Sequence, residues 1–122
     1  MDMMVQVVYK EIMATIDRMD MTCPKLITIE NKISFTAEEG KSEILLKIQD
    51  KNEENVFFVP ANVLKGGVAS GCADAIVLIL RKIKNTRGKV VTIERQNGEL
   101  IIVKGKWTFT IQDYSVDEIK PH

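Results

Sequence analysis

The sequence has few of the groups that catalysis usually needs. Its only histidine is His122, the last of 122 residues. Without an internal histidine, the Ser/His and Cys/His systems that activate a nucleophile are missing. No cluster of histidine, cysteine or carboxylate side chains has the spacing of a metal site. We therefore expect a protein that is not an enzyme and that has no metal and no cofactor.

Cysteines are also few, and long apolar runs are absent. Cys23 and Cys72 fit no CxxC spacing, which predicts free thiols in a reducing compartment. The opening residues, MDMMVQVVYKE, lack the basic region and the long apolar region of a signal peptide. No apolar stretch approaches the roughly 18 residues that a membrane span needs. These features predict a cytoplasmic protein that does not contact a membrane.

The length predicts a single domain over residues 1–122, of which about 114–122 form a C-terminal tail. The 17 basic and 17 acidic residues cancel, so the net charge gives no bias toward polyanions. The charges are unevenly spread, however. Residues 61–89 carry six basic residues and only one acid, Asp74. This stretch is the one basic block of the chain.

Residues 9–19 predict a helix with one buried face, because apolar residues recur at helical spacing. These residues are Tyr9, Ile12, Met13, Ile16 and Met19. The preceding MMVQVV is either a short strand or the start of this helix. The helix should end at Thr22-Cys23-Pro24, because the residue before a proline avoids the helical region.

Strand signals then dominate the sequence. β-Branched and aromatic runs predict four strands before residue 61, at KLITIE, KISFTAE, SEILLKIQ and NVFFVP. Three more follow at KVVTIER, ELIIVKG and KWTFTIQD, joined by turns at Asn97-Gly98 and Gly105-Lys106. In the last strand, the alternating Trp107, Phe109 and Ile111 predict core positions. The expected fold is α+β: a mostly antiparallel sheet of about seven strands, with two helical segments on one face.

The glycine-rich stretch LKGGVASGCADAIVLILRKIKNTRGK, residues 64–89, lacks the glycine and lysine order of a phosphate-binding loop. We interpret it as a break or turn before a second helix, with Ser70 or Gly71 as a possible cap. The apolar AIVLIL run fits a helix or a strand, and the cations after it favour a helix. A run that is apolar on every side needs cover on both sides. The sheet can cover one side, and either the first helix or a second copy can cover the other; the candidate interface residues are Ile76, Val77, Leu78, Ile79 and Leu80.

The order of elements resembles one domain of the bacterial DNA polymerase sliding clamp, the beta subunit. In that family a first strand leads straight into a helix, as MMVQVVYKEIMATIDRM does here. Strands then end in VPA before a second helix, which FFVPANVLK resembles. The closing meander of the family has the pattern L-x-V-x-x-G-x-x-x-F-x-I, and ELIIVKGKWTFTI is similar to it.

The resemblance implies a mechanical role. Clamp subunits carry three such domains and close a six-domain ring whose helices line a central hole, where basic side chains meet the phosphates of duplex DNA without reading the bases. By position, the implied DNA-binding candidates are Lys65, Arg81, Lys82, Lys84, Arg87 and Lys89. The resemblance also implies a homo-oligomer joined through sheet edges.

Two alternatives remain open. The cations at the end of the second helix can equally be a solubilising, dipole-matched helix end. The chain as a whole can instead be a small interaction or ligand-binding module, of the kind a mobile element encodes, that self-associates and binds a protein partner.

Overall fold

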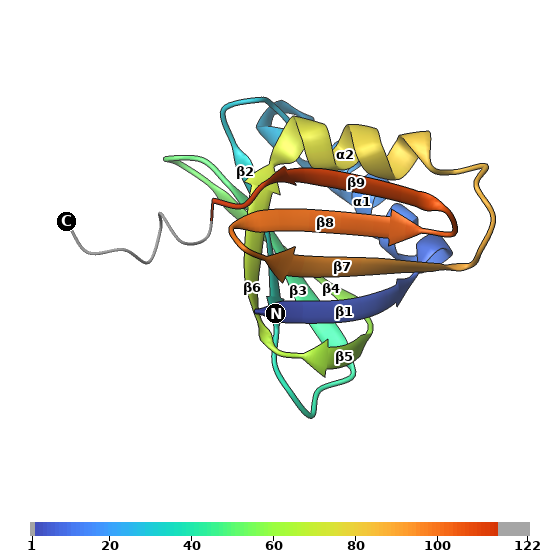
Figure 1. Cartoon of the computed structure of the whole chain (residues 1–122). Coiled ribbons are helices and arrows are strands. Elements are labelled where there is room, and N and C mark those ends of the chain that lie inside the picture. Colours follow the sequence, from blue (N-terminus) through green and yellow to red (C-terminus); the bar gives the residue numbers. More distant parts are fainter. Residues whose placement is uncertain (1, 115–122) are drawn as a thin grey trace.

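The computed structural model of the chain describes residues 2–114, so the predicted tail apart from Tyr114, and with it His122, lies outside the described residues. These residues form an α+β fold of two helices and nine strands in two antiparallel sheets (Figure 1). The predicted class and the antiparallel pairing are confirmed. The strands divide into two sheets that run across one another, where the sequence predicted one sheet of about seven strands.

The five-stranded sheet has the order β5-β1-β7-β8-β9. Its strands are β1 (Met3–Val8), β5 (Asn62–Lys65), β7 (Val90–Gln96), β8 (Glu99–Lys104) and β9 (Trp107–Gln112). The last three form the predicted meander. Asn97 and Gly98 make its first turn with φ angles of 53° and 75°, the left-handed values that a tight hairpin turn requires. MMVQVV is a strand, β1, which pairs with β5 on one side and with β7 on the other.

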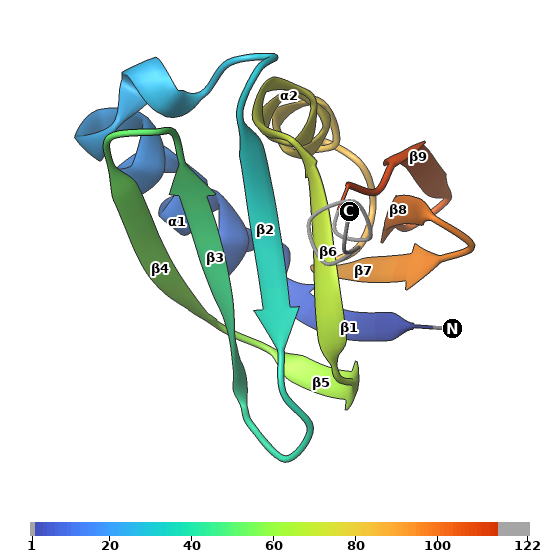
Figure 2. The same cartoon turned by 90° about the vertical axis from the view of Figure 1, so that its left-hand side faces the viewer.

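The four-stranded sheet has the order β4-β3-β2-β6 (Figure 2). Its strands are β2 (Lys32–Ala37), β3 (Glu43–Gln49), β4 (Glu54–Pro60) and β6 (Gly67–Cys72). Only Ala61 separates β4 from β5, and only Gly66 separates β5 from β6. The chain therefore passes from this sheet into the other and back within a few residues.

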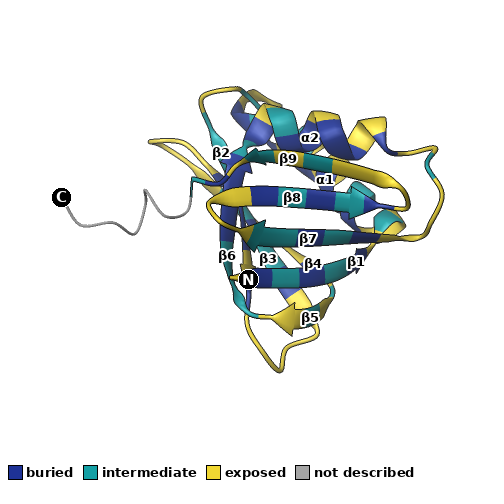
Figure 3. Ribbon diagram, viewed as in Figure 1, coloured by how far each residue is buried: buried dark blue, intermediate teal, exposed yellow. Residues whose placement is uncertain are grey.

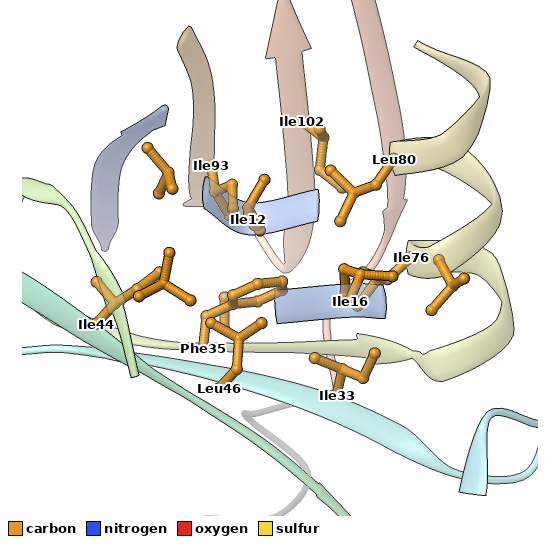
Figure 4. Close-up of a cluster of buried hydrophobic side chains, with 14 of the residues drawn as sticks. Ile12, Ile16, Ile33, Phe35, Ile44, Leu46, Ile76, Leu80, Ile93 and Ile102 are labelled. Atoms are coloured by element: carbon orange, nitrogen blue, oxygen red, sulfur yellow. The ribbon is translucent and has the colours of Figure 1, made fainter. Parts of the chain in front are cut away.

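Helices α1 (Tyr9–Thr22) and α2 (Ala73–Lys82) each bury one apolar face against the sheets. Ile12 and Ile16 of α1, and Ile76 and Leu80 of α2, meet core residues of both sheets such as Phe35 and Ile102 (Figure 4). Buried and more exposed residues alternate along the strands around this core (Figure 3). The helical assignment of AIVLIL is thus confirmed, with the N-cap at Cys72 rather than at Ser70 or Gly71.

The predicted strand at KLITIE is wrong. Pro24–Leu26 is a turn of 3-10 helix, and bends follow it up to β2. The Thr28 hydroxyl accepts hydrogen bonds from the amides of Glu30 and Asn31, and the Asn31 side chain donates to the Leu26 carbonyl at 2.9 Å. These local bonds occupy backbone groups that a strand would offer to a neighbour, and they override the β-branched composition.

The expected break between NVLK and the second helix is also wrong, because residues 62–65 and 67–72 form β5 and β6. The VPA string accordingly precedes two strands and not a helix. Gly71 lies in β6 where the two sheets pack together. A Cβ atom there would come within 2.8 Å of the Ile111 side chain and 3.0 Å of the Leu100 side chain. This glycine serves close packing of a strand, which a turn-based interpretation of glycine misses.

A buried polar cluster joins the two sheets beside Gly71. Arg95 Nε of β7 lies 2.7 Å from Asp113 Oδ2, and Asp113 Oδ1 accepts the amide hydrogen of Ser70 in β6 at 2.8 Å. The Nε hydrogen is not aligned for a hydrogen bond, so the contact is mainly one of charge. The hydroxyls of Ser70 and Ser34 are 2.7 Å apart across β6 and β2. The carboxylate thus accepts a backbone amide and faces a guanidinium, and the two hydroxyls bond to each other, so polar groups are paired where the sheets meet.

Candidate nucleic-acid interface

The basic block of the sequence is centred on the C-terminal end of α2. Arg81 and Lys82 lie in its last turn, where positive charge complements the negative end of the helix dipole. The chain then continues through residues 83–89, here called the 83–89 segment, which carries Lys84, Arg87 and Lys89. All five of these side chains are exposed.

One buried lysine holds the 83–89 segment in place. Lys104, on β8, is only 2% exposed. Its ammonium donates to the Ile83 carbonyl at 3.1 Å, to the Thr86 carbonyl at 2.6 Å and to the Thr86 hydroxyl at 2.9 Å. An ammonium has three hydrogens, so its donor capacity is filled. This side chain therefore acts as a clasp between β8 and the segment.

The start of α1 completes the clasp. Lys104 Nζ lies 4.7 Å from the centroid of the Tyr9 ring, a cation–π distance. The Tyr9 hydroxyl donates to the Leu80 carbonyl in α2, and the Tyr9 amide donates to the Lys89 carbonyl at 2.7 Å. Burial first, and the Asp17 charge second, raise the pKa of Tyr9 above its usual value. The neutral hydroxyl, which can donate, is thereby favoured.

The turn between β8 and β9 rests on the same segment. A Cβ atom at Gly105 would lie 2.5 Å from the Arg87 carbonyl oxygen, so only glycine permits this close approach. This turn, which contains Lys106 and leads into β9 at Trp107, lies beside the segment at the right-hand end of the molecule in Figure 1. We call this surface the basic end. It consists of Arg81, Lys82, Lys84, Arg87, Lys89, Lys106 and Trp107.

Acidic residues of α1 border one side of the basic end. Arg81 Nη2 lies 3.0 Å from Asp20 Oδ2, and both side chains are about half exposed. Asp17 lines a shallow cleft between the helices together with Arg81 and Lys84. Within residues 2–114, Lys82, Arg87 and Lys89 make no ion pair. The uncompensated charge therefore lies mainly beyond the end of α2.

The structure brings together five of the six predicted DNA-binding residues and separates the sixth. Lys65 is exposed on β5, and β5 and β9 are opposite edges of the five-stranded sheet. Among the predicted interface residues, Ile76, Val77, Ile79 and Leu80 are buried within the chain itself, because α2 packs against both sheets. The prediction that these four residues face a second copy is therefore wrong. Leu78 is 62% exposed and remains accessible to a partner.

Sequence reasoning missed the roles of Lys104 and Trp107. Lys104 follows Leu100 and Ile102 at strand alternation, so its place on the core face could have been found from the sequence. Trp107 was placed in the core by the same alternation, but it is 55% exposed. It lies on the inward face at the end of an edge strand, and no strand within residues 2–114 pairs with β9 on its other side. Phe109 and Ile111 are partly buried against the core.

No group of three or more histidine, cysteine or carboxylate side chains in residues 2–114 could hold a metal ion. None of the helices in this part of the chain is both long enough and apolar enough to cross a membrane. Cys23 and Cys72 are free thiols, as predicted.

No protein-family model matches the sequence, and no curated protein sequence matches it. Solved structures do match the fold. The DNA polymerase sliding clamp of Bacillus subtilis aligns over 100% of this chain with a TM-score of 0.77 and 19% identity. The beta clamp of Helicobacter pylori, solved with a DNA ligase peptide, aligns over 98% with a TM-score of 0.77 and 16% identity. The beta sliding clamp of C. crescentus gives a TM-score of 0.76 and 17% identity over 98%.

These alignments confirm the expected resemblance as a likeness of fold. The chain spans about a third of the length of the clamp chains that it matches, 33% for the Bacillus subtilis protein and 32% for the other two. The fold is therefore that of one sliding-clamp domain.

Proposed function

We propose that the chain contacts duplex DNA as one unit of a clamp-like assembly, through phosphates at the basic end and without catalysing a reaction. The fold supports this proposal, and so does the charge of the basic end. The observation that carries it is the Lys104 clasp. A segment whose charges served only solubility would need no buried ammonium to fix its backbone, whereas a phosphate-binding surface gains from preorganised cations.

The contact should be independent of DNA sequence. Four lysines and two arginines make up the positive charge of the basic end, and an ammonium binds phosphate as a point charge without directional readout of base edges. Binding that depends on neutralised phosphates releases counterions, so its affinity falls steeply with added salt. Lys65, at the far edge of the five-stranded sheet, contributes to a DNA-facing surface only if copies assemble around the duplex.

Charge reversal tests the DNA contact. Arg87→Glu with Lys89→Glu is preferable to a pair that includes Arg81 or Lys84, because a carboxylate at Arg81 would face Asp20 and one at Lys84 would share the cleft with Asp17. We expect weaker binding of duplexes of any sequence. If both side chains contact phosphates, the slope of log affinity against log salt should fall in magnitude by about two.

A matched control makes the same change of charge at the other end of α2. Lys25 and Lys51 are exposed and lie near Thr28, whose carbonyl accepts the amide hydrogen of Asp74 in the first turn of α2. Lys25→Glu with Lys51→Glu should change binding much less. Equal losses from the two double variants would show that only net charge matters, and the proposed surface would be rejected.

We also propose that copies associate through the free edges of the five-stranded sheet. Among the described strands, β5 and β9 each pair with a single neighbour, and β9 contains neither a charged residue nor a proline to protect its edge. Pairing β9 of one copy with β5 of the next would continue the sheet from copy to copy. Sedimentation at micromolar concentrations tests this, and a single-chain mass at every concentration would contradict it.

A further inference from the structure

The single tryptophan of the chain lies on the basic end in a held orientation. Trp107 is 55% exposed, and its ring lies 10° from parallel to that of Phe109, with centroids 6.2 Å apart. Phe109 is itself packed against the core and limits how the indole can turn. A half-exposed aromatic ring offers a flat apolar face to a ligand, so its surroundings indicate what it can bind.

Those surroundings are positively charged and rigid. Trp107 pairs across the strands with Lys104, the buried lysine that fixes the 83–89 segment. Lys106 precedes it in the turn, and Gly105 of that turn packs on the Arg87 carbonyl. The indole thus shares one surface with exposed cations of the segment and of the turn.

We propose that the basic end also binds single-stranded DNA, with one unpaired base stacked on the Trp107 indole and the adjoining phosphates on Lys106 and Arg87. An aromatic platform within a positive surface is the usual arrangement for binding single strands, because every base has a π face. Bases within a duplex are already stacked on each other and cannot use the platform. The inference rests on the proposed DNA contact and extends it to unpaired nucleotides, as at a strand end.

Edge pairing between copies leaves this platform available. Pairing at β9 uses backbone groups in the plane of the sheet, whereas the Trp107 side chain points from the inward face of that strand, as Lys104 does. A second copy seated directly on the indole is the competing occupant, and the experiment must separate the two.

The emission of the single tryptophan reports occupancy directly. We expect oligo(dT) of about 12 nucleotides, within the site sizes of such proteins, to quench the emission of Trp107. A duplex of the same length should quench it much less. Inorganic polyphosphate, which has charge but no bases, should compete for the cations without quenching.

Variants give the energetic test by anisotropy of labelled oligo(dT). Trp107→Leu should weaken its binding by about 5- to 100-fold, and Trp107→Phe by less, because stacking is retained. Duplex affinity should hardly change in either variant. Phe58→Leu is the control, since Phe58 is similarly exposed, at 56%, but lies on β4 in the other sheet. It should change neither affinity.

Several results would overturn the stacking site. Equal quenching by polyphosphate, or equal losses of duplex and oligo(dT) affinity in Trp107→Leu, would reduce the contact to charge alone. An emission shift that depends on protein concentration in the absence of DNA would show that a second copy of the chain covers the indole. Duplex binding without any oligo(dT) binding would reject the stacking site and leave the duplex proposal standing. Oligo(dT) binding without duplex binding would reject the duplex contact and leave the stacking site standing. If neither DNA binds, both proposals are rejected.

Discussion

Replacing Lys104 with methionine tests whether the clasp orders the basic end. Methionine keeps most of the length of the buried side chain and removes the ammonium. Three hydrogen bonds are lost, and the carbonyls of Ile83 and Thr86 lose a charged donor. Hydrogen bonds to charged groups contribute about 1.5–3 kcal/mol each, but burying an ammonium costs several kcal/mol, and the variant avoids that cost.

The loss of the hydrogen bonds and the avoided cost of burying the ammonium largely offset each other. We therefore expect the free energy of unfolding in urea to fall by only about 1–3 kcal/mol. The local effect should be larger, because the 83–89 segment loses the side chain that holds it. Amide hydrogen exchange should rise most in that segment, and duplex affinity should fall although no phosphate contact is removed. Lys106→Met, at an exposed position, should leave stability within about 0.5 kcal/mol. Unchanged exchange over residues 83–89 in Lys104→Met would refute the clasp.

Three further predictions follow from burial and charge. Asp113→Asn removes the fully buried partner of Arg95 and should lower the free energy of unfolding by about 3 kcal/mol, measured in urea. Leu78→Asp should leave the protein folded, whereas Leu80→Ala should cost about 2–5 kcal/mol; the reverse order by thermal unfolding would contradict the burial of α2. The raised pKa of Tyr9 means that the unfolded chain releases this proton first, so stability should fall as the pH rises past about 10. Tyr9→Phe should show a smaller fall over the same pH range.

The periodic parts of the fold could be predicted from the sequence. The helix at residues 9–19, the strands of the final meander and the Asn97-Gly98 turn have patterns in which local preference and burial agree. Residues 62–72 could not be assigned, because their glycines make room for backbone and side-chain atoms that are distant in sequence. Gly71, for example, makes room for Leu100 and Ile111. Such contacts leave no local signal.

The candidate site was predicted as a set of charges and not as a surface. Cations that follow α2 in sequence remain neighbours in space, whereas Lys65 lies at a distant sheet edge that only the strand order reveals. The exposure of Trp107 likewise depends on β9 being an edge strand, and alternation along a single strand does not specify its neighbours.

Lysine acetylation in the presence and absence of a duplex, read out residue by residue by mass spectrometry, tests the proposed DNA contact most directly. Lys82, Lys84, Lys89 and Lys106 are exposed and should be protected by the duplex at low salt, and protection should disappear as salt is added. Lys25 and Lys51 serve as internal controls in the same sample and should react equally with and without DNA. Protection of the control lysines to the same extent, or no protection at the basic end under conditions where the duplex is bound, would contradict the account.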